Sequence, residues 1–256
     1  MPSLIACRPG VYGKFMDRAW THLPQIGVRH VEIGVPSTDD HESVRRNLNE
    51  HGLTASSMHV EFDIQKGDVV DQVRPQFEMM ASFSSRIAFV SIHSGELNEM
   101  VAWERLRSVG DCAVEYDVTL SLESHPNLVT NGDVAHHTMT QVNHPNICVN
   151  FDTANVLYYN HDTDSVKELK KVIEFVASVH LKDSQGVYHE WNFPSLGKGV
   201  VNFPQVFEQL GQRGFDGPYT MELEGYPQLN TDDEAAVLAY VSDSVSYLKQ
   251  IGVMDK

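Results

Sequence analysis

Four short apolar runs of this 256-residue chain each end in a side chain that could bind a cation. These side chains are Glu123, Asp152, His180 and Glu222. Charged groups are rarely buried unless they are paired or bind a metal ion. If the runs are parallel strands, the three carboxylates would repel one another at a shared mouth, and a divalent cation would relieve that repulsion. The sequence therefore predicts that these four residues bind one metal ion.

The donor set indicates which metals fit. Three carboxylates and one imidazole form a mostly hard site that suits Mn²⁺ or Mg²⁺, with Mn²⁺ the first expectation and Co²⁺ or Zn²⁺ as alternatives. Four protein ligands leave one or two positions for a bidentate substrate such as a hydroxy-ketone. The metal would polarise the carbonyl, one carboxylate would remove the α-proton, and another on the opposite side would return it.

Other polar side chains occupy further strand ends. His59 belongs to the third run, His93 directly follows the fourth, and Glu32 belongs to the second. All three are candidates for contact with the substrate. Alternatively, the two histidines line the barrel with satisfied hydrogen bonds, and Glu32 pairs with an arginine such as Arg8.

The elements that would position these residues alternate along the chain. β-branched or apolar runs recur at intervals of roughly 30 residues, and each is followed by a helix-like stretch, which is typical of a parallel sheet. A doubly wound sheet would show a Gly-rich phosphate turn after an early strand, and none is present. About eight runs close a barrel, so we expect an α/β fold, a single (β/α)8 TIM barrel. The expected strands are Leu4–Ala6, His30–Ile33, Ser57–Val60, Ile87–Ile92, Thr119–Leu122, Ile147–Asn150, Ala177–His180 and Tyr219–Glu222.

The longest stretch without periodicity is 184–202, between the seventh and eighth strands. A long loop at that end of a barrel is a candidate cover for the active site. It contains Gly197-Lys198-Gly199, which suggests either a phosphate cradle or, more commonly, a simple turn.

Composition limits the partners and the location. The length fits one domain of residues 1–256, because such barrels typically have about 250 residues. A formal net charge of −16 argues against nucleic acid and membrane partners. Three cysteines without a CxxC pair indicate a reduced, cytoplasmic protein. We see no signal peptide, and no apolar run reaches the roughly 18 residues of a membrane span.

The order and spacing of several motifs are similar to those of one family. Over nearly its whole length the chain resembles the xylose isomerase-like TIM barrel superfamily, which includes sugar phosphate isomerases and epimerases and AP endonucleases. The motifs are LESHP at 122–126, NFDTAN at 150–155, VHLKD at 179–183, LGKG at 196–199, and GFDG at 214–217 followed by Met221-Glu222.

The resemblance implies roles for individual residues. Glu123, Asp152, His180 and Glu222 match the metal-binding positions of the ketose epimerases, and Glu123 and Glu222 match the catalytic acid/base pair of that group. Lys182 and His125 match positions that touch substrate oxygens, and Lys182 is also a candidate proton donor in the dehydratases. The list of expected substrate-binding residues is therefore His59, His93, His125, Lys182 and Glu32.

Two departures from the family pattern narrow the function. AP endonucleases have a histidine where this chain has Asn155, and they carry an Asp-x-His pair where it reads WNFP at 191–194, so a multi-zinc DNA-repair site is not expected. The ketose 3-epimerases have a substrate-binding arginine shortly after the His180 position, where this chain reads SQGV at 184–187. The second departure leaves the metal site intact but weakens the specific 3-epimerase assignment.

Three functions follow as hypotheses. The first is a metal-dependent isomerase or epimerase of a small keto sugar, acting by proton transfer through a metal-bound enediolate. The alternative is a metal-dependent dehydratase or lyase of a keto-inositol or 3-keto-glycoside. An AP endonuclease and a non-catalytic sugar-binding barrel rank lower. The partner is a small carbohydrate in each leading case, and the resemblance leaves a homo-oligomer open.

Overall fold

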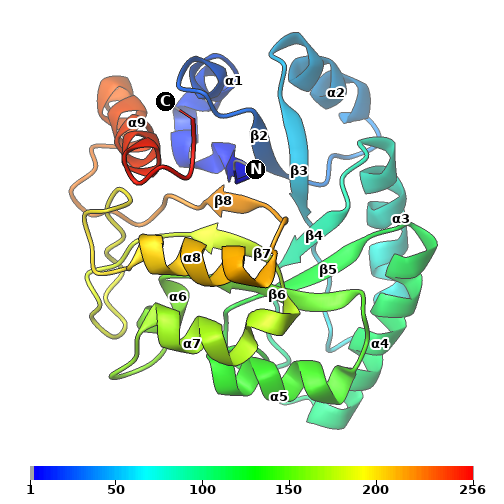
Figure 1. The fold of residues 1–256 in the computed structure, drawn as a ribbon. Coiled ribbons are helices and arrows are strands. Elements are labelled where there is room, and N and C mark those ends of the chain that lie inside the picture. Colours follow the sequence, from blue (N-terminus) through cyan, green and yellow to red (C-terminus); the bar gives the residue numbers. More distant parts are fainter. Residues whose placement is uncertain (1–2, 256) are drawn as a thin grey trace.

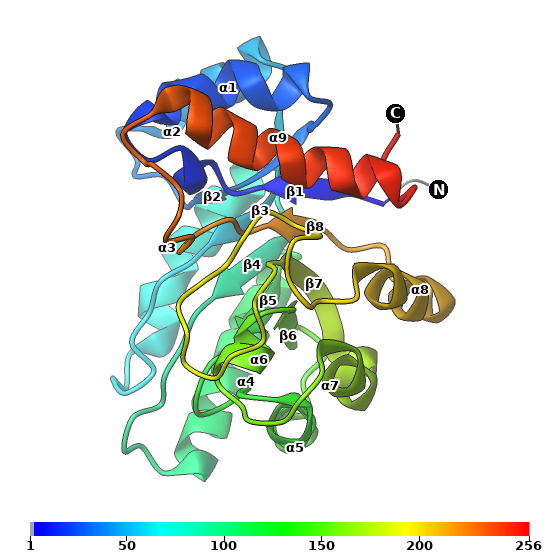
Figure 2. The same cartoon turned by 90° about the vertical axis from the view of Figure 1, so that its left-hand side faces the viewer.

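Eight parallel strands close into a barrel in the computed structural model, which describes residues 3–255. The strands follow chain order, and β1 pairs with both β2 and β8. Helices surround the barrel, as Figures 1 and 2 show from two sides. This arrangement confirms the expected (β/α)8 fold. The expected domain of 1–256 includes residues 1, 2 and 256, which lie outside the described range.

Among the described residues, no helix combines the length and the apolar character that crossing a membrane requires.

Strands and helices alternate along the chain, as the sequence pattern predicts. The strands are β1 (Ile5–Cys7), β2 (His30–Gly34), β3 (Thr54–His59), β4 (Ile87–Val90), β5 (Thr119–Glu123), β6 (Ile147–Asp152), β7 (Val176–Leu181) and β8 (Tyr219–Met221). The helices are η1 (Pro9–Phe15), α1 (Met16–Gln25), α2 (His41–Glu50), α3 (Val69–Ser82), α4 (Glu99–Glu115), α5 (Gly132–Val142), α6 (Asn155–Tyr158), α7 (Ser165–Val172), η2 (Ile173–Phe175), α8 (Phe203–Arg213) and α9 (Glu234–Gln250).

Local sequence sets the ends of α8. The side chain of Asn202 accepts a hydrogen bond from the backbone N–H of Gln205, which caps the first turn, and Pro204 occupies a position where a missing N–H costs nothing. The helix ends at Gly214, whose φ of 78° is the left-handed conformation that glycine adopts readily. These signals hold α8 between β7 and β8, as expected from Pro204.

The strand bounds differ from the sequence expectation by two or three residues at β3, β4 and β6, and β6 continues to Asp152 instead of ending at the expected Asn150. β3 begins at Thr54, three residues before the expected Ser57, and β4 ends at Val90, two residues before the expected Ile92. Thr54 pairs in register with His30, which extends the ladder beyond the apolar run that the sequence pattern detects. These differences in where a strand begins or ends do not change the direction in which the side chains of the site residues point.

Two register shifts aim side chains into the barrel mouth. On β3, one extra residue places Ser57 opposite Glu32. On β7, one extra residue places His180 opposite Asp152. A bulge of this kind redirects every side chain that follows it, so these two irregularities decide which polar groups meet.

Candidate metal centre

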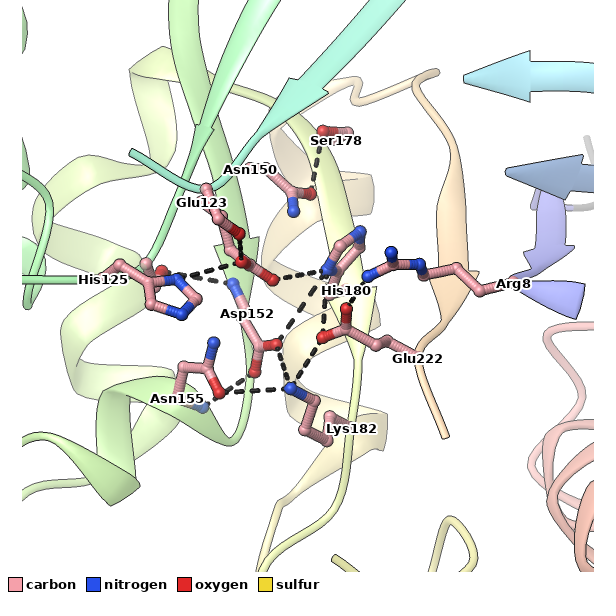
Figure 3. A network of polar contacts seen from close by, with 12 residues as sticks. Arg8, Glu123, His125, Asn150, Asp152, Asn155, Ser178, His180, Lys182 and Glu222 are labelled. Carbon is pink, nitrogen blue, oxygen red and sulfur yellow. Dashed lines mark hydrogen bonds and ion pairs between the residues drawn. The ribbon is translucent and has the colours of Figure 1, made fainter. Parts of the chain in front are cut away.

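Four side chains from neighbouring strand ends converge in Figure 3. Glu123 ends β5, Asp152 ends β6, His180 lies in β7 and Glu222 directly follows β8. Each is at most 5% exposed, and each offers one ligand atom that lies within 4.8 Å of the other three. The structure thus brings together the four residues that the sequence predicts as metal ligands.

His180 lies at the centre of this cluster. Its Nδ1 atom is 2.8 Å from Glu123 Oε1, 3.3 Å from Glu222 Oε2 and 4.0 Å from Asp152 Oδ2. Glu123 and Glu222 approach this nitrogen from different sides (Figure 3). The space bounded by these atoms is lined by oxygen and nitrogen lone pairs, which is the environment that a hard divalent cation requires.

Asp152 is fixed by the start of α6. Its Oδ1 atom accepts hydrogen bonds of 2.8 Å from the backbone N–H groups of Ala154 and Asn155. Its Oδ2 atom and Glu222 Oε2 are buried and accept no well-aligned hydrogen bond. The ammonium group of Lys182 lies beside both oxygens, but buried carboxylate oxygens that lack well-aligned hydrogen bonds are still costly. A bound cation would satisfy both oxygens, so the residues present fit a metal ion.

Two basic side chains border the cluster. Lys182 is only 1% exposed, and its Nζ atom lies 2.6 Å from Glu222 Oε2, 3.2 Å from Asp152 Oδ2 and 2.9 Å from Glu224 Oε1. On the other side Arg8 forms an ion pair with Glu222 and places its Nε atom 3.6 Å from Glu32 Oε1. These cations offset part of the buried negative charge.

Burial and mutual repulsion shift the pKa values of the cluster. Burial, reinforced by the charges of Glu222 and Glu123, raises the pKa of Asp152 to about 7. Burial and Glu222 oppose ionisation of Glu123, yet hydrogen bonds from His125 and His180 bring its pKa down to about 2. Burial opposes a charge on His180, but Glu222 and Glu32 raise its pKa well above the usual value. The four side chains therefore favour a positive charge between them, and a bound divalent cation would supply that charge.

The expected substrate contacts lie around the same mouth. His125 Nδ1 is 2.9 Å from Glu123 Oε2, and the ring of His93 lies edge-on to the ring of His125 at 5.5 Å. The ring of His59 packs at 4.8 Å against Phe89, which in turn lies 4.5 Å from the His180 ring. Lys182 and Glu32 contact the cluster directly. All five residues are thus near the candidate metal centre, and their contact with substrate stays a prediction.

Sequence reasoning missed several neutral groups in this network. Ser57 donates a hydrogen bond of 2.6 Å to Glu32 Oε2, Ser91 donates to Glu123, and Asn155 Oδ1 accepts from Lys182 Nζ at 3.2 Å. Serine and asparagine are common in polar segments, so their type alone gives no signal. The position of Ser57, two residues before His59 on the same strand, is the only hint in the sequence that it faces inward.

Two cavities flank the centre. One of about 440 Å³ lies between the loops after β1 and β2 and is lined by Arg8, Trp20 and Ile33 among others. The other, of about 460 Å³, is lined by Trp191, Glu224 and other residues of the loops after β1, β7 and β8. Both open beside residues that touch the cluster. The first cavity is lined by Arg8 and Glu32 and the second by Glu224, which contacts Lys182, so each adjoins side chains that lie next to the candidate ligands.

The segment after β7 runs along this mouth without forming a helix, as expected for 184–202. It contacts the end of α6 through a hydrogen bond of 3.0 Å from His189 N to Tyr158 O. It contacts the loop after β8 through Phe193 N and Gly225 O at 3.3 Å. Phe193 also lies against Lys182, whose Nζ is 5.1 Å from the ring centre. The segment therefore shields one side of the candidate centre.

Comparison with known proteins gives partial matches to sugar epimerases. L-ribulose-5-phosphate 3-epimerase UlaE of Escherichia coli (strain K12 / DH10B) is 39% identical over 85 residues, which is 33% of this chain and 28% of that protein. The chain thus matches little more than a quarter of the length of this curated relative. The shared segment is too short to transfer the activity of the whole protein.

Solved structures extend the likeness to the entire fold. D-allulose 3-epimerase from Methylomonas sp. superposes with a TM-score of 0.74 at 16% identity, covering 97% of both chains. The probable 3-DHS dehydratase AsbF from Bacillus anthracis superposes with a TM-score of 0.75 at 14% identity, covering 97% of this chain and 99% of that one. At these identities the likeness establishes the fold alone. The family model described as "Xylose isomerase-like TIM barrel" matches residues 21–249, and the chain belongs to that family.

Proposed function

We propose that this protein is a divalent-metal-dependent epimerase or isomerase of a small keto sugar. The observation that carries the proposal is the convergence of Glu123, Asp152, His180 and Glu222 within 4.8 Å. The epimerase names of the relatives and the family membership support the same class of substrate. Glu123, Asp152, His180 and Glu222 would hold the ion, and when bound it would polarise the substrate carbonyl as a Lewis acid.

Glu123 and Glu222 are the proposed proton-transfer pair. They approach the cluster from β5 and from the end of β8, so a sugar seated between them would present one face of its α-carbon to each carboxylate (Figure 3). One glutamate, ionised, takes the α-proton, and the other, which must enter the step protonated, gives its proton to the opposite face, so that the carbon is inverted and the two glutamates exchange protonation states. Burial and Glu222 oppose ionisation of Glu123, but His125 and His180 lower its pKa, so this carboxylate is ionised before substrate binds.

His125, His93 and Lys182 are proposed to orient substrate oxygens. His125 Nδ1 is 2.9 Å from Glu123 Oε2 and so lies beside the proposed base. Lys182 lies beside Glu222 on the other side. A ketose offers hydroxyl groups on both sides of its carbonyl, and these side chains would fix its orientation between the two glutamates.

The test is proton exchange with solvent. The Mn²⁺-loaded protein is incubated with a panel of ketoses in D₂O, and NMR follows both deuterium incorporation and formation of an epimer or isomer. We expect incorporation with at least one ketose, and Glu123→Gln or Glu222→Gln should reduce its rate by about 10²- to 10⁴-fold, as for loss of a general acid or base. Glu50→Gln, an exposed change at the end of α2, should leave the rate unchanged.

Absence of exchange with every ketose would contradict the proposal. A dehydratase is the second candidate, because the buried Lys182 Nζ beside Glu222 could give a proton to a departing hydroxyl while a glutamate removes the α-proton. The products would be water and an enone. Absorbance of an enone appearing with a β-hydroxy ketone, in place of deuterium exchange, would favour this candidate.

A further inference from the structure

Glu32 reaches the candidate metal centre from the far side of His180. It lies in β2, is 2% exposed, and its Oε1 atom is 3.0 Å from His180 Nε2. Its Oε2 atom accepts a hydrogen bond of 2.6 Å from Ser57, and Arg8 Nε lies 3.6 Å from Oε1. The carboxylate is therefore held in place by two neighbours while it faces the imidazole.

The two nitrogens of His180 face different surroundings. Nδ1 faces Glu123, Asp152 and Glu222, and Nε2 faces Glu32. A histidine that binds a metal ion is neutral, with a proton on one ring nitrogen and a lone pair on the other. If the proton sits on Nδ1, it is donated to Glu123 Oε1, and the lone pair points away from the three other ligand atoms. If it sits on Nε2, it is donated to Glu32, and the lone pair points into the cluster.

We propose that Glu32 is a positioning residue that selects the second arrangement and so makes Nδ1 of His180 the metal-binding atom. A carboxylate that accepts from the outer N–H of a metal-binding histidine fixes both the tautomer and the orientation of the ring. Ser57 and Arg8 keep Glu32 turned toward His180. This role replaces the contact with substrate that the sequence suggested for Glu32. It rests on the metal site of the proposed function but not on the reaction.

The geometry of the barrel supports this assignment. Glu32 and His180 are 148 residues apart in the chain, and they meet because the barrel closes through β1 and β8, which brings β2 and β7 around the same interior. The register shift in β3 brings Ser57 opposite Glu32. Glu32 adjoins the cavity of about 440 Å³ next to Arg8, but its side chain is only 1% exposed. A group so enclosed is suited to hold a neighbouring ligand.

The first test is metal affinity, measured without substrate. Isothermal titration calorimetry would measure Mn²⁺ binding to the metal-free proteins. We expect Glu32→Gln to bind Mn²⁺ about 10- to 100-fold more weakly than the unaltered protein, which is the usual effect of losing a group that orients a metal ligand. Ser57→Ala removes one of the groups that hold Glu32 and should weaken binding by a smaller factor. Glu50→Gln, at the end of α2, should bind Mn²⁺ as the unaltered protein does.

Equal affinity of Glu32→Gln and the unaltered protein would overturn the proposal. An unchanged affinity with a raised KM for a sugar would also overturn it, because that result identifies a substrate contact. If the unaltered protein binds Mn²⁺ but exchanges no substrate proton, the proposed reaction fails while this inference stands.

A second measurement needs no variant. In the Zn²⁺-loaded protein with ¹⁵N-labelled histidine, NMR should show a proton on Nε2 of His180 and the metal on Nδ1. Metal on Nε2, or a proton on Nδ1, would refute the assignment even if Glu32→Gln does not fold.

Discussion

Asp152 and Asp183 are both buried at strand ends, but their oxygens are used differently. Asp152 turns one oxygen to the N–H groups of Ala154 and Asn155 and leaves the other for the cluster. Asp183 has both oxygens occupied. They accept from four backbone N–H groups, those of Ser184, Gly197, Gly199 and Val201, at 2.8–3.2 Å.

The hydrogen bonds of Asp183 also answer a question raised by the sequence. The amides of Gly197 and Gly199, which could have formed a phosphate cradle, already bind this internal carboxylate. A side chain at Gly199 would overlap Ser184 O and the Asp183 carboxylate, so glycine is required for the close approach. The glycine motif therefore closes the 184–202 loop onto the end of β7.

Asp183→Asn is expected to loosen this loop. The amide supplies only one acceptor oxygen, so backbone N–H groups lose their partner, and the free energy of unfolding should fall by about 1–3 kcal/mol. Urea denaturation would measure the loss, and limited proteolysis should show faster cleavage within 184–202. The exposed Asp216→Asn change is the control. If Asp183→Asn had the same free energy of unfolding and the same cleavage rate as Asp216→Asn, the proposed role of Asp183 in holding the 184–202 loop would be contradicted.

At the scale of elements, the first and last helices are joined through one imidazole. His22 of α1 lies 2.7 Å from Tyr12 Oη through Nδ1 and 3.0 Å from Ser242 Oγ of α9 through Nε2. Burial, helped by the charge of Arg18, lowers the pKa of His22 below its usual 6.5. The neutral ring is thus the form that holds η1, α1 and α9 together.

This contact predicts acid sensitivity. Because the folded-state pKa of His22 is lowered, the unfolded chain binds its proton first, so the free energy of unfolding is fully retained above pH 6.5 and falls as the pH drops below it. Urea midpoints at pH 8, 7, 6 and 5 would measure the loss. His22→Gln keeps hydrogen-bonding atoms but cannot titrate, and its stability should depend less on pH. The same pH slope for both proteins would refute the idea.

At the scale of the whole molecule, barrel closure concentrates charge that no single element carries. Strands β5, β6 and β7 and the residue directly after β8 contribute the four proposed metal ligands, while the residue directly after β1 and strand β2 contribute Arg8 and Glu32. These groups meet only in the folded chain. Any ion that binds there binds the folded state alone and must stabilise it.

Metal addition should therefore raise the melting temperature. At a Mn²⁺ concentration about 100 times the Kd, binding adds about 2.7 kcal/mol, which for a protein of this size corresponds to an increase of about 5–10 °C. Differential scanning calorimetry with EDTA and with Mn²⁺ would measure it. Asp152→Asn should lose most of the increase. No increase with Mn²⁺, Mg²⁺, Co²⁺ or Zn²⁺ would contradict the metal centre.

Much of the fold could be predicted from the chain itself. The runs around Leu120, Val149 and Val179 are apolar because these strands are covered on both sides, and such runs alternate with helical spacing. Strands that alternate with helices run parallel to one another, and parallel strands place their carboxyl ends, with Glu123 and His180, at the same end of the barrel. The single domain of 1–256, the cytoplasmic location and a homo-oligomer stay predictions.

Contacts within the site could not be read from the sequence in the same way. Arg8 and Glu222 are separated by 214 residues and Glu32 and His180 by 148, so nothing local links them. The register shift that sets Ser57 opposite Glu32 has no reliable signal in residue type. These contacts and this shift depend on how neighbouring strands pack against one another.

The sequence by itself determined the barrel, the mouth at which the polar residues gather and the identity of the four candidate ligands, because periodicity and strand order are local properties of the chain. Only the tertiary structure decided that Nδ1 of His180 faces the carboxylates, that Glu32 lies behind its ring and that Asp183 fills the glycine-rich turn. The reason is physical. Orientation and hydrogen-bond pairing depend on register and packing between segments that are distant in sequence, and these are fixed only when the barrel closes.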